Sequence, residues 1–451
     1  MVQTKAQEAG ERMFAGRTDT YEKRKINVMD RIEFEVGGGL EIPLPKMVPV
    51  RQRFESQRVE NVAGAVREGF QSPNFATRIK PGMKVAIGAG SRGIANIADA
   101  VRSTVEAVKA LGGEPFIFPA MGSHGSATAE GQRGVLEGYG ITEEFTGAPL
   151  RATMETVVIG ELPDGTPIHV DKFAHEADGV ILVNRVKPHT NFRGEVESGI
   201  LKMLTIGMAK IEGATILHTF GFDTFHALIP RVAEFILNKM NILGGVALVE
   251  NGYDQTAIVE VIPGDQLFER EVLLQQQAKR LMARLWFDEF DVLIIDEMGK
   301  DISGAGFDPN VTGRQNRGLP WEARPTLQKI VVLDLTEATH GNACGLGLAD
   351  VVTRRLFEKM DMASTYANIV TSTCLDGGAI PIIMNSSRDA VLLAVKTTLR
   401  RKPQDCRIVR IKNTLMLENI LVSEPLLSQV EEHPNLETIG APELLTFADD
   451  V

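Results

Sequence analysis

The stretch that decides the fold is residues 179–221, which read GVILVNRVKPHTNFRGEVESGILKMLTIGMAKIEGATILHTFG. Its first part, Val180–Val183, is a short apolar run typical of a parallel strand that is buried on both faces. The loop that follows holds the polar and basic residues Asn184, Arg185, Lys187, His189, Asn191 and Arg193. Because open α/β sheets bind ligands beyond the carboxyl ends of their strands, this loop is predicted to belong to a functional site.

Two more residues of the stretch can carry chemistry. Lys202 lies in an apolar run, where a lysine either extends its amine to water or holds it in a pocket that makes it a nucleophile. His218 ends the run, and such a histidine is a hydrogen-bonded core residue or a ligand. Since His189, Lys202 and His218 follow one strand, we expect them to form one site.

Length and composition limit the classes of protein that the chain can be. A chain of 451 residues is longer than one ordinary core supports, so two domains are predicted, residues 1–275 and 276–451, with the final segment free to return to the first domain. The net charge of −11 gives no basic surface for nucleic acid. No apolar run reaches the length of a membrane span, and the first residues lack a signal peptide's apolar core, so we expect a cytoplasmic protein.

A glycine-rich turn joins the strand expected at residues 84–87 to the helix expected at residues 94–111. The turn reads GAGSRG over residues 88–93 and matches GxGxxG, a pattern that lets backbone amides approach a phosphate. The strand expected at residues 115–119 ends without the carboxylate that would hold a ribose, which disfavours a standard NAD site. An anion-binding turn with Gly90, Ser91 and Arg92, or a plain tight turn, both remain open.

Two other loops carry candidate residues. His124 follows the strand expected at residues 115–119, in the sequence GSHG, and its position at a strand end matches that of His189. Lys300 follows the strand expected at residues 292–295 in a glycine-rich loop. The roles of the polar stretch 301–317 and of His340 stay open.

The remaining pattern is that of a chain of βα units. We expect hairpins at residues 32–44 and 157–170, helices at 58–70, 222–240, 265–287, 351–360 and 387–399, and strands at 246–249, 330–335, 408–411 and 415–421. The predicted fold class is therefore α/β, with two domains of mainly parallel sheets flanked by helices and an active site in the cleft between them.

The motifs, taken in order, resemble the nickel-dependent lactate racemase superfamily. They are GSRG at 90–93, GSHG at 122–125, KPH at 187–189, Lys202 with His218 sixteen residues later, and EMGK at 297–300. The chain departs from the family pattern in a longer insert before Lys202, which contains Glu195 and Glu197, and in Ala89, where an acidic residue is usual. These departures suggest a distinct branch whose substrate can differ from lactate.

The resemblance implies a racemase or epimerase of a 2-hydroxy acid. Its cofactor would be nickel held in pyridinium-3,5-bisthiocarboxylic acid mononucleotide, the nickel-pincer nucleotide, made by separate cofactor-biosynthesis proteins. The resemblance implies that Lys202 tethers the cofactor and His218 ligates nickel. It also implies that His124 and His189 exchange the hydroxyl proton while the α-hydrogen moves as hydride to the pyridinium ring. Arg92 and Lys300 would orient the substrate.

Two other functions remain in competition. A nicotinamide-dependent hydroxyacid dehydrogenase would use the glycine-rich turn for a dinucleotide and His189 as acid and base. A non-catalytic homologue would bind a nucleotide or nickel without turnover. The sequence does not fix the substrate, its stereocentre or whether the chain forms a homo-oligomer.

Overall fold

The computed structural model describes residues 36–90, 93–316, 319 and 324–447. The chain divides into two compact units, Met1–Glu41 and Ile42–Val451. In the described end of the first unit, the main chain turns so that the amide of Gly39 donates to the carbonyl of Val36 at 2.7 Å. The second unit contains both large sheets of the molecule and all the candidate residues that are described below.

The first sheet has five strands in the order β3-β2-β6-β7-β8. Its members are β3 (Glu114–Pro119), β2 (Lys84–Ala89), β6 (Gly179–Arg185), β7 (Ile242–Glu250) and β8 (Thr256–Pro263). The first four run parallel, and β8 returns antiparallel to β7. Strand β6 is therefore central, as its unbroken apolar run predicts.

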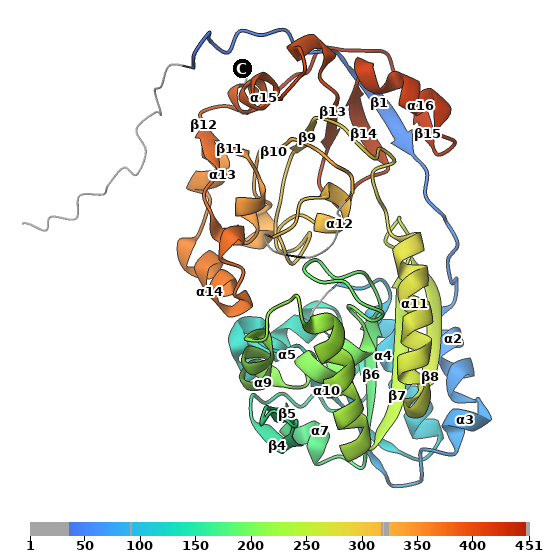
Figure 1. Ribbon diagram of the computed structural model, residues 1–451. Helices are drawn as coiled ribbons and strands as arrows, with labels where there is room; N and C mark the ends of the chain where they lie inside the picture. The colour runs from blue at the N-terminus through green and yellow to red at the C-terminus, as the bar shows by residue number, and fades with distance from the viewer. Residues whose placement is uncertain (1–35, 91–92, 317–318, 320–323, 448–451) are drawn as a thin grey trace, which may run out of the picture. The chain divides into compact units, whose positions relative to one another are not determined.

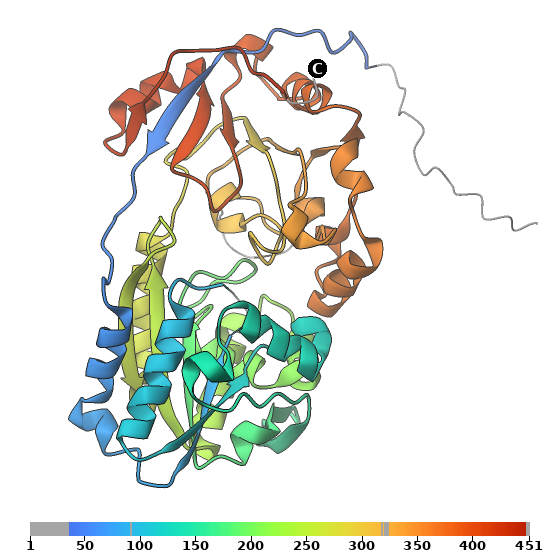
Figure 2. The ribbon, with the colours of Figure 1, turned by 180° about the vertical axis from the view of Figure 1, so that it is seen from behind.

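The side chains of β6 alternate between two separate cores. Val180 and Leu182 join one buried cluster, whereas Ile181 and Val183 join the other. Helices α10 (Phe225–Lys239) and α11 (Leu267–Leu281) supply the first cluster, and helices α2 (Val62–Phe70) and α4 (Ile97–Ala110) supply the second. Figure 1 shows α10 and α11 in front of this sheet, and Figure 2 shows α2 and α4 on its other face.

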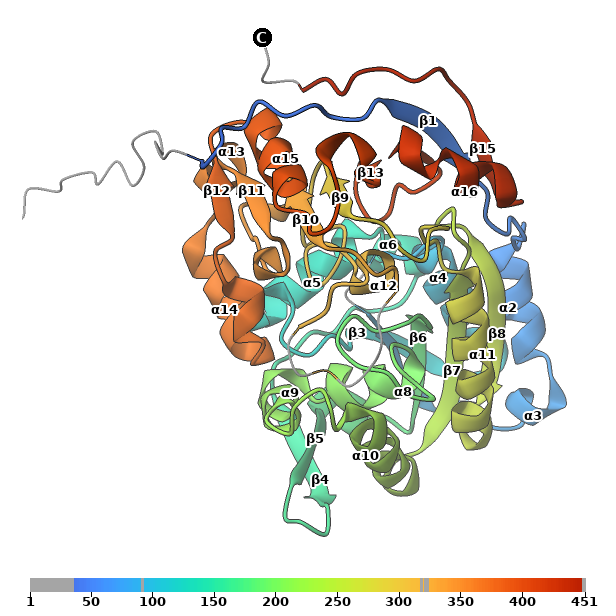
Figure 3. The ribbon, with the colours of Figure 1, turned by 45° about the horizontal axis from the view of Figure 1, so that its top comes forward.

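The second sheet has eight strands in the order β12-β11-β10-β9-β13-β14-β1-β15. They are β12 (Ile382–Met384), β11 (Val351–Thr353), β10 (Lys329–Val332), β9 (Val292–Ile295), β13 (Ile408–Ile411), β14 (Asn419–Ser423), β1 (Met47–Gln52) and β15 (Leu436–Thr438). The first five are parallel, and the rest pair antiparallel. Figure 3 shows β1, from early in the chain, beside β15, from near its end.

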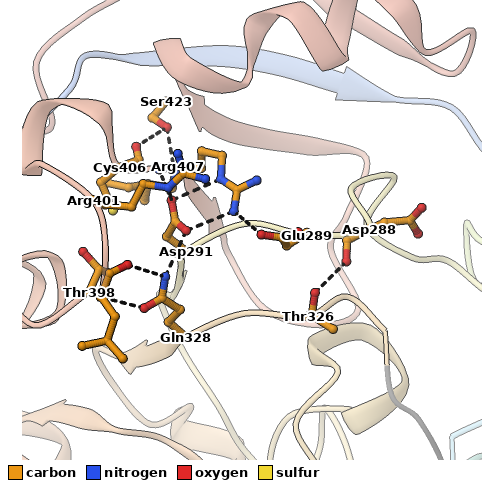
Figure 4. A network of polar contacts seen from close by, with 12 residues as sticks. Asp288, Glu289, Asp291, Thr326, Gln328, Thr398, Arg401, Cys406, Arg407 and Ser423 are labelled. Carbon is orange, nitrogen blue, oxygen red and sulfur yellow. Dashed lines mark hydrogen bonds and ion pairs between the residues drawn. The ribbon is translucent and has the colours of Figure 1, made fainter.

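A buried carboxylate joins the amino ends of three strands in this second sheet (Figure 4). Asp291 precedes β9 and is 1% exposed. Arg407 precedes β13, and its backbone amide donates to the carboxylate of Asp291 at 2.9 Å. The guanidinium of Arg407 donates to the same carboxylate at 3.1 and 3.2 Å. Gln328, which precedes β10, donates to it at 3.2 Å. Burial alone would raise the pKa of Asp291, but the hydrogen bonds from Arg407 outweigh it and hold the pKa below its usual range.

Further helices and a separate sheet of β4 and β5 complete the fold. They are α3 (Pro73–Ala76), α5 (Ala129–Gly138), α6 (Glu143–Thr146), β4 (Thr156–Glu161), β5 (Pro167–Asp171), α7 (Lys172–His175), α12 (Pro309–Thr312), α13 (Arg354–Glu358), α14 (Met362–Ser372), α15 (Ser387–Lys396) and α16 (Leu427–Glu432). None of the helices in the described ranges is both long and apolar enough to cross a membrane.

The structure confirms the α/β class and the mainly parallel sheets, and it corrects three local expectations. Val351–Thr353 form strand β11 rather than the start of a helix, because these β-branched residues pair with β10. The short helix α13 begins only after them, and the hydroxyl of Thr353 caps it. Residues 40–44 are not a strand, and residues 32–35 of that expected hairpin lie outside the described part. Strand β8 was not expected at all.

The division of the chain at residue 275 stays a prediction. The two sheets do not divide the chain in sequence order, because β1, at Met47–Gln52, pairs with β14 and β15. The final strand likewise stays in the eight-stranded sheet.

Candidate active site

The loop after β6 is closed on itself by the backbone. The amide of Lys187 donates to the carbonyl of Ser198 at 2.8 Å, and the amide of Ser198 donates back to Lys187 at 3.1 Å. Inside this closed loop, Glu197 is fully buried and accepts the amide of His189 at 2.7 Å and the amide of Gly194 at 3.3 Å. The acidic insert noted in the sequence is thus the support of the His189 loop.

Lys202 stands where a helix changes its geometry. It ends the short helix α8 (Ile200–Lys202), a π-helical turn follows at Met203–Gly207, and the chain continues as α9 (Lys210–His218). Single π turns are rare and recur at functional sites.

His189 and Lys202 are in direct contact. The Nε2 atom of His189 lies 2.8 Å from the Nζ atom of Lys202. The other ring nitrogen, Nδ1, accepts the backbone amide of Asn191 at 3.0 Å. A neutral imidazole carries only one proton, so in this arrangement the proton is on Nε2 and points at the lysine. With this tautomer, the contact is a hydrogen bond if the amine of Lys202 is neutral and accepts the proton of Nε2.

The electrostatic surroundings keep His189 uncharged. Burial is the main reason that the pKa of His189 lies well below its usual value, and the positive charges of Lys187 and Arg193 act in the same direction. The ring packs on Phe192 at 4.4 Å between centroids, which excludes water from that face. The ring of His189 is therefore neutral at physiological pH, the form that could exchange a proton with a bound molecule.

His218 is oriented as a metal ligand would be. Its Nδ1 lies 2.5 Å from the carbonyl oxygen of Ala214, one helical turn earlier, so Nδ1 carries the proton and Nε2 presents a lone pair. Burial is the first cause that lowers the pKa of His218, which keeps the ring in its neutral form, as a metal ligand would require. The centroid of the Phe222 ring lies 5.5 Å from that of His218 and 5.8 Å from that of His189, so both imidazoles pack near the same phenyl ring.

A buried lysine holds the loop of His124. The Nζ atom of Lys210 donates to the carbonyl of Pro119 at 2.6 Å and to Gln132 at 3.0 Å, and it forms an ion pair with the carboxylate of Asp171 at 2.9 Å. Gln132 in turn donates to the carbonyl of His124 at 3.2 Å. The main chain of His124 is thus tied to the segment that follows Lys202.

Packing accounts for two glycines of the glycine-rich turn. A Cβ atom on Gly88 would collide with Leu182 and Phe118, and one on Gly90 would lie 3.0 Å from both Asn184 and Met203. Both glycines therefore allow close approach of protein groups, which favours the structural interpretation of this turn over a dinucleotide site. Ser91 and Arg92 lie outside the described residues, so their predicted roles are not tested.

Lys300 lies in the loop after β9, as predicted, and its Nζ atom donates to the carbonyl of Gly304 at 2.7 Å. Its backbone amide donates to the hydroxyl of Thr339 at 3.0 Å. The structure thus anchors Lys300 in its own loop, whereas it brings His189, Lys202 and His218 together.

Sequence reasoning missed several residues that support the site. Asn310 donates to the carbonyl of His189 at 3.3 Å and accepts from Arg193 at 2.5 Å, and Asn316 donates to Asn191 at 3.3 Å. The polar stretch after Lys300 was noted, but nothing in its composition indicates which loop it contacts.

The fold and the cluster of residues identify the class of protein. It is an α/β protein that carries a histidine and lysine pair, and a histidine with one nitrogen free for a ligand, beyond the carboxyl end of a central parallel strand. Residues 41–223 match the family model of the lactate racemase N-terminal domain. Over this part, the chain resembles the lactate racemase N-terminal domain. The matched range includes His124, His189, Lys202 and His218.

One solved structure is similar over most of its length, the lactate racemase apoprotein from Thermoanaerobacterium thermosaccharolyticum. The similarity covers 86% of this chain and 96% of that one, at 12% sequence identity and a TM-score of 0.49. No curated protein matches the sequence of the chain.

Proposed function

We propose that the protein is a racemase or epimerase of a 2-hydroxy acid that works with the nickel-pincer nucleotide. The observation that carries the proposal is the contact of 2.8 Å between His189 and Lys202, with His218 on the next helix, inside the range that matches the lactate racemase N-terminal domain. Such a cluster offers a nucleophilic amine, an acid and base, and a metal ligand in one buried place.

The residues present fit this cofactor. Lys202, whose amine contacts Nε2 of His189, would hold the nucleotide covalently as a thioamide. His218 directs the lone pair of Nε2 away from Ala214 and is suited to bind nickel, a metal that imidazole nitrogen ligates well. In the described residues, no three His, Cys, Asp or Glu side chains form a metal cage, so the other ligands would come from the nucleotide.

When bound, the cofactor would supply an electrophilic ring that accepts the α-hydrogen of the substrate. The protein's part is proton transfer and positioning. With Nδ1 accepting the amide of Asn191, Nε2–H of His189 would donate a proton to a substrate oxygen, and taking the hydroxyl proton at Nε2 would require the tautomer that carries its proton on Nδ1. His124, at the end of β3, is proposed to serve the opposite face. Lys300, with Arg92, is proposed to bind the carboxylate.

Histidine variants test this proposal. The protein, co-produced with the cofactor's biosynthetic proteins, would be incubated with single enantiomers of a panel of 2-hydroxy acids, and the products separated by chiral chromatography. His189→Ala is expected to lose at least about a hundredfold in turnover while it keeps nickel, because general acid and base catalysis contributes about that much. His226→Ala is the matched control, since His226 is exposed on α10. Equal turnover of both variants would refute the assignment.

A further inference from the structure

Helix α11 lies next to the site but outside the range that matches the lactate racemase N-terminal domain. Its residues Glu271, Gln275 and Lys279 follow each other at intervals of one helical turn, so they share a face. Glu271 is fully buried and Gln275 is 1% exposed. Buried polar side chains are costly unless they do a specific task, so this face requires an explanation.

The first contact of this face is with the start of the Lys202 helix. Oε2 of Glu271 accepts the amide of Leu201 at 3.0 Å, and the carboxylate also bonds to the amide of Ile200. Gly199, just before α8, leaves room for it, because a Cβ atom there would collide with the carboxylate. Glu271 thus replaces the capping side chain that α8 lacks in its own sequence.

The second contact is with the loop of His189. Nζ of Lys279 lies 2.6 Å from Oε1 of Glu197, whose other oxygen accepts the amide of His189 at 2.7 Å. The same helix therefore holds the backbone next to Lys202 through one carboxylate and the backbone of His189 through another.

We propose that Glu271 is a positioning residue: it fixes the helix of Lys202 so that the amine of Lys202 stays on Nε2 of His189. This inference rests on the proposed role of Lys202, but it concerns only groups of the protein. The alignment matters because a solvated lysine is protonated at neutral pH, with only about one molecule in a thousand in the neutral form. A helix that shifts away from His189 would lose the hydrogen bond that keeps the amine neutral.

The test is the reactivity of Lys202 in the cofactor-free protein. Acetylation by N-acetoxysuccinimide at neutral pH would be followed at the Lys202 peptide by mass spectrometry. Glu271→Ala is expected to slow acetylation at least about tenfold, because the buried amides of Ile200 and Leu201 lose their acceptor. Glu271→Gln, which keeps an acceptor oxygen, is expected to stay within about threefold of the wild-type rate. Glu269→Ala, exposed on the same helix, is the control.

A double variant separates positioning from loss of structure. In a His189→Ala background the neutral state is already lost, so Glu271→Ala is expected to add less than about twofold. A tenfold effect in both backgrounds, or wild-type reactivity in Glu271→Ala, would overturn the proposal. If Glu271→Ala does not fold, Glu271→Asp serves instead, since it keeps the charge but withdraws the carboxylate, and a rate unchanged from wild type would again overturn it.

The proposed function fails by a different result. If Lys202 of the wild-type protein reacts no faster than exposed lysines such as Lys239, the nucleophilic role of Lys202 is wrong, whatever Glu271 does.

Discussion

Replacing Glu271 by glutamine is predicted to change how the stability of the protein depends on pH. Burial raises the pKa of this carboxyl from 4.5 to about 7, against the effect of the hydrogen bonds from Leu201 and Ile200. The folded protein therefore binds the proton more tightly than the unfolded chain does. This contribution to stability is complete below the unfolded pKa of 4.5 and is lost as the pH rises through the folded value of about 7.

The magnitude follows from the two pKa values. A rise in the pKa of Glu271 from 4.5 to about 7, at about 1.4 kcal/mol per pKa unit, corresponds to a stability contribution of roughly 3 kcal/mol. Oε1 of Glu271 has no hydrogen-bond partner within the described part of the chain, so it is the oxygen that would carry the proton. Glutamine places an uncharged amide group in that position at every pH. The Glu271→Gln variant should therefore gain about 3 kcal/mol relative to wild type between acid and alkaline pH.

Urea-induced unfolding, followed by far-ultraviolet circular dichroism between about pH 5 and pH 8.5, measures this difference. Most of the gain falls within this range, so we expect about 2 to 3 kcal/mol there. Glu269→Gln, on the exposed face of the same helix, should stay parallel to wild type at every pH. A difference between Glu271→Gln and wild type that stays constant within about 0.5 kcal/mol would refute the reasoning.

Three further predictions concern the buried contacts at Gly199, Lys210 and Asp291. Gly199→Ala should lower the unfolding free energy by about 1 to 3 kcal/mol, because the added methyl group would collide with the buried carboxylate of Glu271. Gly134→Ala is the control, since a methyl group there meets open space and should not lower the unfolding free energy. Thermal unfolding compares the two variants. Lys210→Met should lower the unfolding free energy by about 3 to 5 kcal/mol because it leaves Asp171 buried and without its ion-pair partner. Adding Asp171→Asn to the same chain should recover part of this loss. If the losses of the two single variants simply add, the reasoning is wrong. Because the pKa of Asp291 is lowered in the folded protein, the wild type loses stability as the pH falls through the acid range. Asp291→Asn should therefore be less stable than wild type near neutral pH. Its stability should also change less with pH in the acid range, as measured by the same unfolding assay.

Much of the fold could be predicted because its signals are local. The apolar run 180–183 indicated a central strand, and the structure places its alternate side chains in two cores. The hairpin of β4 and β5 followed from its turn sequence, with antiparallel pairing from Thr156 to Asp171 as expected. Where the prediction of α13 failed, pairing with β10 over Val351–Thr353 decided the structure, and pairing partners are not visible in a single segment.

The sequence could predict that three candidate residues lie close together, but only part of their geometry. The order of His189, Lys202 and His218 along the chain indicated one cluster, and the structure brings these three together. The support by Glu271 could not be foreseen, because it depends on a contact between residues 70 positions apart. The hydrogen-bonding state of Lys202 likewise depends on the amide of Asn191, whose direction no sequence pattern fixes.

The measurement that tests the central claim most directly is nickel content together with intact mass, on protein co-produced with the cofactor's biosynthetic proteins. The account predicts nearly one nickel per chain and a mass increase of the size of the mononucleotide, which Lys202→Ala abolishes and Lys239→Ala, at an exposed lysine, leaves unchanged. Neither nickel nor added mass on the wild-type protein from such a host would contradict the account, and tight binding of NAD in their place would favour a dehydrogenase.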